Sequence, residues 1–206
     1  GYRDFKAPLT QFRDYFIYKN AQKIICQSQF HKKIVEKNLE LTNIISVGGN
    51  LWSLDVLEKL RELSKVEKED KCSILRSPHI HKGTQKSIDY CIKKNLNYDL
   101  VNDLDYISFL QKLGRNKKLV FFPNSPETLS RVVCEARMMG MAVATNDLVG
   151  AAQEKWFKLK GERLVDHMID KRHEIVNIIK KEIHKTPTFN KERPEISIIS
   201  TFHNGK

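Results

Sequence analysis

Short apolar runs alternate with segments of helical periodicity along most of the 206-residue chain. The runs have the length of buried strands, and in the segments between them apolar residues recur every three or four positions. Two parallel strands need a crossover connection, which is usually a helix. The alternation therefore predicts an α/β protein with a parallel sheet and helices packed on its faces.

Residue spacing and end signals define the expected elements. Ser28 and Ser53 are expected N-caps, and Gly114 and Gly140 are expected to stop helices. The mixed-charge run 65–71 is expected to be a solvated face or a linker. Strands are predicted over residues 23–27, 43–47, 72–76, 98–101, 118–123 and 141–145, and helices over residues 8–20, 28–38, 53–66, 82–94, 104–113, 129–139 and 163–186.

The end of the sequence departs from this alternation. Residues 187–193 are a polar linker, and residues 196–200 form a new apolar run. One strand cannot fold alone, and an apolar character on both faces is typical of the middle of a parallel sheet. We therefore expect residues 194–206 to be the first strand of a further domain. The missing initial Met likewise indicates a fragment or a processed product.

The segment after the 118–123 strand carries the most informative polar residues. Ligands of open parallel sheets bind beyond the carboxyl ends of the strands, and a helix N-terminus there offers unpaired amides to a diphosphate. Glu127 lies at the mouth of the predicted helix, and Glu135 lies two turns further along roughly the same face. A carboxylate can accept both hydroxyls of a ribose. The alternative interpretation makes Glu127 an ordinary first-turn acid and Glu135 a surface residue.

Three segments resemble one protein family. The segment FFPNSPETLSRVVCEARMMGMAVATND, with two acids spaced E-x7-E, resembles the donor-site signature of family 4 glycosyltransferases with the GT-B fold. Residues 21–38 resemble the last strand and helix of that family's N-terminal domain. Residues 72–88 resemble the first strand and loop of its C-terminal domain. The resemblance spans about residues 8–160.

The resemblance implies a fold and an activity. Residues 1–50 would end an acceptor-side Rossmann-like domain, so this N-terminal domain is only partial, and 51–162 would form a trimmed, donor-binding Rossmann-like domain. The chain would be a glycosyltransferase of the hexosyltransferase class that moves a sugar from a nucleotide-sugar to an unidentified acceptor. Residues 193–204 resemble the opening strand of a family 2 glycosyltransferase of the GT-A type, in which the run Thr201-Phe202-His203-Asn204 would touch the nucleotide.

The resemblance also implies roles for individual residues. Glu127, the catalytic position, would contact the donor sugar, and Glu135 would hold the nucleotide ribose. Arg76 and Lys82 would neutralise the diphosphate, although in so lysine-rich a chain they also fit plain surface charges. Cations and a helix N-terminus stabilise a leaving nucleoside diphosphate without a metal.

The loop before the helix both matches the family and departs from it. The amides near Leu129 and Ser130 would cradle the diphosphate, and Arg131 would assist. Ser130 stands where the family usually has Gly, which alters how closely the backbone approaches a phosphate. The usual Gly before Arg76 is missing, and one strand, 98–101, is predicted where the family commonly has two.

Net charge limits the partners. Lys+Arg 36 against Asp+Glu 25 leaves +11, which favours anionic partners such as phosphorylated small molecules, nucleic acid or an anionic membrane surface. Lysines alternate with acids, so nucleic acid is not expected, although a non-catalytic nucleotide- or nucleic-acid-binding module stays the alternative function. Peripheral association with an anionic membrane also stays open. We expect no cofactor for the GT-B part, and a divalent metal only in the missing second domain.

Cysteine and histidine usage predicts no metal or redox site. The four cysteines are far apart and lack a C-x-x-C pair, so we expect buried free thiols and a reducing, cytoplasmic location. His79 and His81 lack a third ligand and are expected to be a loop pair beside a phosphate site. The chain opens with polar residues, unlike a signal peptide, and no apolar run approaches the roughly 20 residues of a membrane span.

Overall fold

The computed structural model describes residues 15–102 and 105–184. Its strands are β1 (Ile24–Cys26), β2 (Ile44–Ser46), β3 (Glu69–Leu75), β4 (Tyr98–Val101), β5 (Asn116–Phe121) and β6 (Ala142–Thr145). Its α-helices are α1 (Tyr15–Asn20), α2 (Gln29–Leu39), α3 (Leu54–Ser64), α4 (Thr84–Lys93), α5 (Tyr106–Gly114), α6 (Arg131–Met138) and α7 (Glu162–His184). The described residues also form the short 3₁₀ helices η2 (Ile80–Lys82), η3 (Gly150–Gln153) and η4 (Lys155–Lys158).

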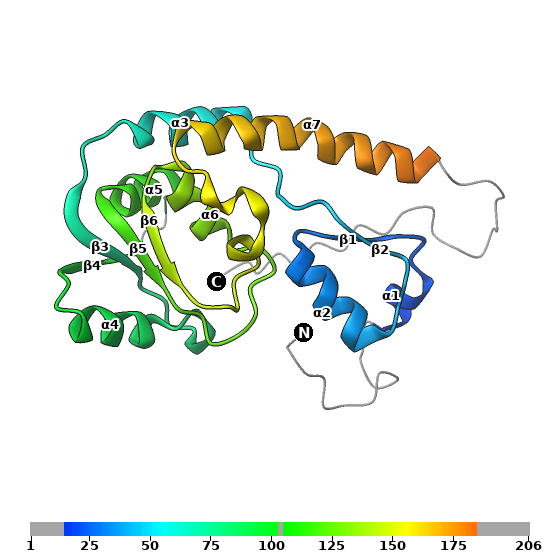
Figure 1. Cartoon of the computed structure of the whole chain (residues 1–206), viewed down its shortest axis with the longest axis horizontal. Coiled ribbons are helices and arrows are strands. Elements are labelled where there is room, and N and C mark those ends of the chain that lie inside the picture. Colours follow the sequence, from blue (N-terminus) through cyan, green and yellow to red (C-terminus); the bar gives the residue numbers. More distant parts are fainter. Residues whose placement is uncertain (1–14, 103–104, 185–206) are drawn as a thin grey trace.

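The strands form two separate parallel sheets (Figure 1). β1 pairs with β2 in the smaller sheet, and the larger sheet has the strand order β4-β3-β5-β6. All neighbouring strands of the larger sheet run parallel. The α/β fold class that the alternation predicted, with a Rossmann-like parallel sheet, is thereby confirmed.

Helices cover both faces of the larger sheet (Figure 1). α4 packs on one face, α5 and α6 pack on the other, and α3 and α7 form a layer outside them. The alternating residues of β5 follow this arrangement, because Leu119 and Phe121 belong to the main core while Val120 joins a second cluster with Cys72 and Cys91. A strand buried on both faces is continuously apolar, as the sequence of β5 indicates.

The strand order places a ligand-binding position between β3 and β5. The chain leaves β3 for β4 through α4, on one face of the sheet, and then reaches β5 through α5, on the other face. Loops after two strands diverge at such a switch point, and ligands of open α/β sheets bind beside them. The loops after β3 and β5 therefore form the edge of the sheet where a ligand is expected.

α7 runs beside both sheets (Figure 1). Its buried Ile175 is 3% exposed, and Arg172 Nη1 donates to the carbonyl of Trp52 at 2.9 Å, in the segment that connects the two sheets. Near its end, Glu182 pairs with Lys23 at 3.7 Å, just before β1. One helix thus contacts the surroundings of both sheets.

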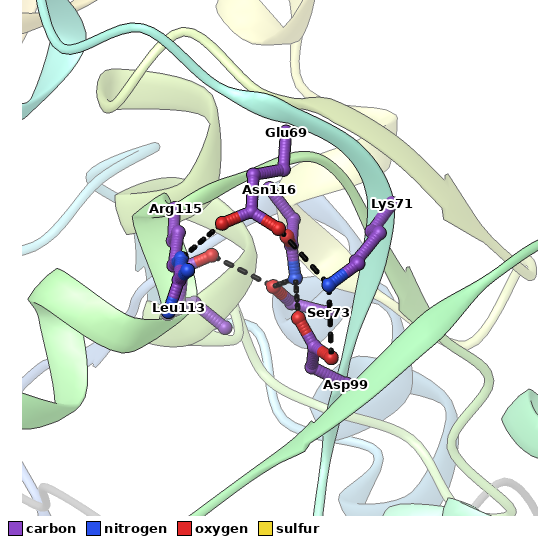
Figure 2. Close-up of polar contacts among 7 residues, drawn as sticks. All are labelled: Glu69, Lys71, Ser73, Asp99, Leu113, Arg115 and Asn116. Carbon is purple, nitrogen blue, oxygen red and sulfur yellow. Dashed lines mark hydrogen bonds and ion pairs between the residues drawn. The ribbon is translucent and has the colours of Figure 1, made fainter.

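A polar network at the amino ends of β3 and β5 corrects one prediction (Figure 2). The run 65–71 was expected to be a solvated face or linker, yet Glu69–Lys71 belong to β3. The Glu69 amide donates to the carbonyl of Arg115 at 2.9 Å, and the Glu69 carboxylate pairs with Lys71 at 3.0 Å and with the Arg115 guanidinium. Hydrogen bonds first from Lys71 and then from Arg115 hold the pKa of Glu69 below its usual range.

The same network buries Asn116, the first residue of β5 (Figure 2). Its Nδ2 donates to Ser73 Oγ and to Asp99 Oδ2, both at 3.0 Å. Ser73 Oγ in turn donates to the Leu113 carbonyl at 2.8 Å. These bonds join three strands and the end of α5 at the edge opposite the switch-point loops, so the network is structural.

Several predicted ends differ from the observed ones. Gly114 was expected to stop a helix, and α5 does end there, but without the positive φ of a glycine C-cap. The missing side chain of Gly114 lets Met139 pack close by. Gly140 does stop α6, with φ +81°. The segments 8–14, 187–193 and 194–206 and residue Leu104 lie outside the described residues.

Two glycines with the same backbone conformation allow a matched stability test. Gly83 has φ +63° and Gly161 has φ +59°. A Cβ at Gly83 would overlap the Phe122 carbonyl, whereas a Cβ at Gly161 would meet nothing closer than 4.0 Å. We predict that Gly161→Ala costs about 1–2 kcal/mol for the left-handed conformation alone, and that Gly83→Ala costs about 2–5 kcal/mol because overpacking is added.

Urea unfolding of both variants and the wild type measures the two costs. The difference between the two variants isolates the overlap with Phe122. Equal losses of stability would contradict the close approach of α4 to the end of β5.

Candidate functional site

The loops after β3 and β5 lie against each other at the switch point. The Asn124 amide donates to the His81 carbonyl at 2.9 Å, and Asn124 Nδ2 donates to the Ile80 carbonyl at 2.7 Å. Gly83 makes this approach feasible, because any side chain there would overlap the backbone at Phe122. The predicted site residues of the two loops are thereby brought to one edge of the sheet.

An ion pair joins the two loops. Lys82 Nζ donates to Glu127 Oε1 at 2.9 Å, and the two side chains are 30% and 17% exposed. The backbone of Glu127 is held as well, because its amide donates to Leu148 O at 2.8 Å and its carbonyl accepts from the Gly150 amide at 3.0 Å. The site thus contains a fixed carboxylate and a cation that neutralise each other.

Arg76 lies at the end of β3, where its amide donates to the Val101 carbonyl at 2.9 Å. Its side chain is exposed. Within the described part of the chain, the guanidinium makes no hydrogen bond or ion pair. Arg76 therefore presents a positive charge next to the loop that carries Lys82.

The N-terminus of α6 faces the same edge of the sheet. The helix begins at Arg131, so Leu129 and Ser130 precede it, and no side chain caps its first turn. Leu129 is 1% exposed and Ser130 is 7% exposed. Open first-turn amides together with the helix dipole make this end a favourable place for an anion.

Glu135 is buried, and one of its carboxylate oxygens accepts three hydrogen bonds. It is 2% exposed, and its Oε1 accepts from Trp52 Nε1 at 3.0 Å, from Tyr106 Oη at 2.7 Å and from Arg131 Nε at 3.3 Å. The Arg131 guanidinium lies 5.5 Å from the ring centre of Trp52 and 5.9 Å from that of Tyr106. Within the described residues, Oε2 accepts no hydrogen bond.

Burial and the nearby carboxylate raise the pKa of Tyr106 above its ordinary value. Desolvation disfavours the phenolate, and the negative charge of Glu135 disfavours it further. The Tyr106 hydroxyl therefore keeps its proton and stays a hydrogen-bond donor to Glu135 throughout the neutral range.

The structure corrects the spacing argument for the two acids. Because α6 begins at Arg131, Glu127 is not a first-turn acid, and it does not share a helical face with Glu135. Glu127 pairs with Lys82, and Glu135 pairs with Arg131. The interpretation of Glu135 as a surface residue is also wrong, since it is buried.

Sequence reasoning missed Trp52 and Tyr106. A buried carboxylate needs donors, and the indole N–H and the phenol hydroxyl are donors that aromatic residues bring into a core. Trp52 lies 83 positions before Glu135, and Tyr106 lies 29 positions before it. No local pattern links residues at such separations.

Neither a metal centre nor a membrane span is found in the described ranges. Across residues 15–102 and 105–184, no three metal-ligating side chains gather in one place, and no helix has the length and apolar character to cross a bilayer. His79 and His81 lie beside the switch-point loops, and both are exposed. All four cysteines are buried free thiols, as expected.

The comparisons with known proteins include one solved glycosyltransferase structure. No family model matches the chain, and no curated protein matches it. Among solved structures, a glycosyltransferase from Rickettsia africae ESF-5 has a TM-score of 0.46 and 15% sequence identity, and the match covers 89% of this chain and 69% of that one.

The two tryptophans allow a matched test of the Glu135 cluster. Trp52 Nε1 donates to the Glu135 carboxylate at 3.0 Å, and Trp156 Nε1 donates to the neutral Gly48 carbonyl at 2.8 Å. Both residues are buried, so Trp→Phe removes a similar volume at each. We predict that the hydrogen bond lost in Trp52→Phe costs about 1.5–3 kcal/mol and the one lost in Trp156→Phe about 0.5–1.5 kcal/mol, because bonds to charged groups are stronger.

Chemical denaturation of both variants at neutral pH measures this difference. A larger loss in Trp156→Phe than in Trp52→Phe would show that Glu135 does not depend on the indole donor.

Proposed function

We propose that this chain is the donor-binding part of a GT-B glycosyltransferase and that it binds a nucleotide-sugar through the diphosphate. The observation that carries the proposal is the Lys82–Glu127 pair at 2.9 Å, which lies beside the uncapped N-terminus of α6 at the switch point of a parallel sheet. The family 4 resemblance of the same two loops supports it.

The diphosphate would lie between Lys82, Arg76 and the N-terminus of α6. Lys82 supplies a point charge, and the amides of the first turn, with no side-chain cap, supply donors. Preorganised donors of this kind stabilise the charge that develops on a leaving nucleoside diphosphate. For this part of the protein, the chemistry needs no metal.

The ribose would bind to Glu135 through a single oxygen. Oε1 already accepts three hydrogen bonds from the protein, which leaves Oε2 for a ribose hydroxyl. The sequence had suggested that both oxygens are free for the two hydroxyls. Arg131, which lies over Trp52 and Tyr106, would hold the carboxylate in place instead of binding phosphate.

Glu127 would contact the sugar after an exchange of partners. Its Oε1 pairs with Lys82 at 2.9 Å. A phosphate that binds Lys82 frees the Glu127 carboxylate, which can then accept a hydroxyl of the sugar next to the diphosphate. Donor binding on this proposal replaces one ion pair by two ligand contacts.

The acceptor side remains a proposal based on the sequence alone. α1, α2, β1 and β2 would belong to the acceptor-side domain. We also propose a hexosyl donor, as the resemblance implies, and a cytoplasmic location, which suits the four free cysteines. Peripheral contact with an anionic membrane would suit the net charge of +11.

We predict that the chain binds UDP, GDP or ADP about 10- to 100-fold more tightly than the matching nucleoside, the factor expected from one or two charge-assisted hydrogen bonds. Calorimetry at fixed salt measures both ligands. Lys82→Ala should remove most of the difference. Lys59→Ala is the matched control and should bind both ligands like the wild type. Lys59 forms a similar 2.8 Å pair, with Glu62 on α3.

Equal affinity for diphosphate and nucleoside would overturn the proposed function. Binding of duplex DNA or RNA that collapses between low and moderate salt would favour the nucleic-acid-binding alternative instead.

Two glutamine variants separate the roles of the acids. Glu135→Gln should weaken nucleoside diphosphate binding, because an amide NH₂ replaces an oxygen that accepts from the ribose. Glu127→Gln should leave this affinity unchanged or raise it, since Lys82 loses its competing partner, and it should lower sugar transfer by the full-length enzyme. Equal loss of nucleotide affinity in both variants would show that this division is wrong.

A further inference from the structure

The N-terminus of α6 differs from those of three other helices in this protein. Ser28, Ser53 and Asp105 each accept a hydrogen bond from the amide three residues on, with N···O distances of 3.0, 3.3 and 2.7 Å. Ser130, the corresponding residue of α6, makes no such bond. The serine that could cap this helix therefore leaves the first-turn amides open.

The backbone conformation of Ser130 explains the missing cap. Ser130 has φ +72° and ψ +92°, whereas the three capping residues have φ of −143°, −64° and −85°. A non-glycine residue at this φ is strained. The residue before Ser130 imposes this conformation. The carbonyl of the buried Leu129 accepts a hydrogen bond from the Ala151 amide at 3.0 Å, and the chain must then turn into α6.

The side chain of Ser130 adds a second cost. The residue is 7% exposed, and its Oγ is buried without a hydrogen-bond partner. An unpaired buried hydroxyl destabilises the fold. Glycine would remove both costs, because it adopts positive φ freely. Because Ser130 destabilises the fold in two ways, we expect it to contribute to the function of the site.

We propose that the Ser130 hydroxyl is a direct hydrogen-bond donor to the diphosphate, which adds a side-chain ligand to the open amides of α6. This inference rests on the proposed function and deepens it. Phosphate oxygens only accept hydrogen bonds, and Oγ at the start of α6 has a donor with no other use. An oxyanion bound at the start of α6 would also accept hydrogen bonds from the first-turn amides, because the Ser130 hydroxyl does not cap them.

Because Oγ is buried, an anion would reach it only when the loop 123–130 shifts. Contacts with the smaller sheet region fix the position of this loop. Thr128 Oγ1 donates to Gln27 Oε1 at 2.7 Å, and Ser28 Oγ donates to the Thr128 carbonyl. Such a shift would have to open these two bonds and also the backbone bonds of Glu127 and Leu129 to residues 148–151.

The test uses the 206-residue chain and inorganic pyrophosphate as the probe, which removes any contribution from base or ribose. We expect Ser130→Ala and Ser130→Gly to bind pyrophosphate about tenfold more weakly than the wild type, the loss of one hydrogen bond to a charged group. The thermal midpoint should rise in Ser130→Gly and should not fall in Ser130→Ala. Ser64→Ala, at the far end of α3, is the control and should bind like the wild type.

The outcomes separate this inference from the proposed function. If Lys82→Ala loses pyrophosphate while both Ser130 variants bind it like the wild type, the role of Ser130 is overturned and the diphosphate site stands. If the wild type itself does not bind pyrophosphate at millimolar concentration, both fail. A lower thermal midpoint for Ser130→Gly would also overturn the inference, because the strain that motivates it would be absent.

Discussion

One buried carboxylate joins the elements around the candidate site. Glu135 on α6 accepts from Tyr106 at the start of α5 and from Trp52 in the segment between the two sheets. A buried charge without donors costs several kcal/mol, roughly 3–5 when one partner of a pair is removed. The positions of α5, α6 and the connecting segment are therefore tied to the requirements of a single side chain, and Arg131 is held over both aromatic rings by the same group.

The acids of the candidate site are already paired before any ligand arrives. Lys82 neutralises Glu127, and Arg131 neutralises Glu135. On the proposed function, binding would be an exchange of partners, in which the ligand offers charges or hydroxyls that match those it displaces. A doubly charged diphosphate next to a hydroxyl-rich sugar would satisfy that requirement at Lys82 and Glu127, whereas a nucleoside alone would not.

The alternation of apolar runs was sufficient to predict the fold class and the strands of the larger sheet, because a strand buried on both faces has a local signature. β4 was predicted at its observed bounds. Errors arose where a distant partner sets an element's end. β3 begins early because Glu69 meets Arg115, and α6 begins late because the residues before it bond to 148–151.

The candidate site was predictable only in part for the same reason. The two loops and the residues Arg76, Lys82, Glu127 and Glu135 could be selected from their position after strands. The pairing of Glu127 with Lys82 crosses 45 positions of sequence, and the donors to Glu135 come from further elements. The strain at Ser130 follows from the fixed Leu129 backbone, which the local sequence does not reveal.

The course of α7 limits how the smaller sheet can move relative to the larger one. The two regions share the chain crossing at 47–53, and α7 packs beside both, with Arg172 bonded to Trp52 and Glu182 paired with Lys23. Direct bonds join the two regions as well, because the Gln29 amide donates to Glu154 Oε1 at 2.8 Å and Trp156 Nε1 donates to the Gly48 carbonyl at 2.8 Å. A displacement of the smaller sheet would therefore have to break bonds on both sides of the chain crossing together, so α7 and these contacts resist it jointly.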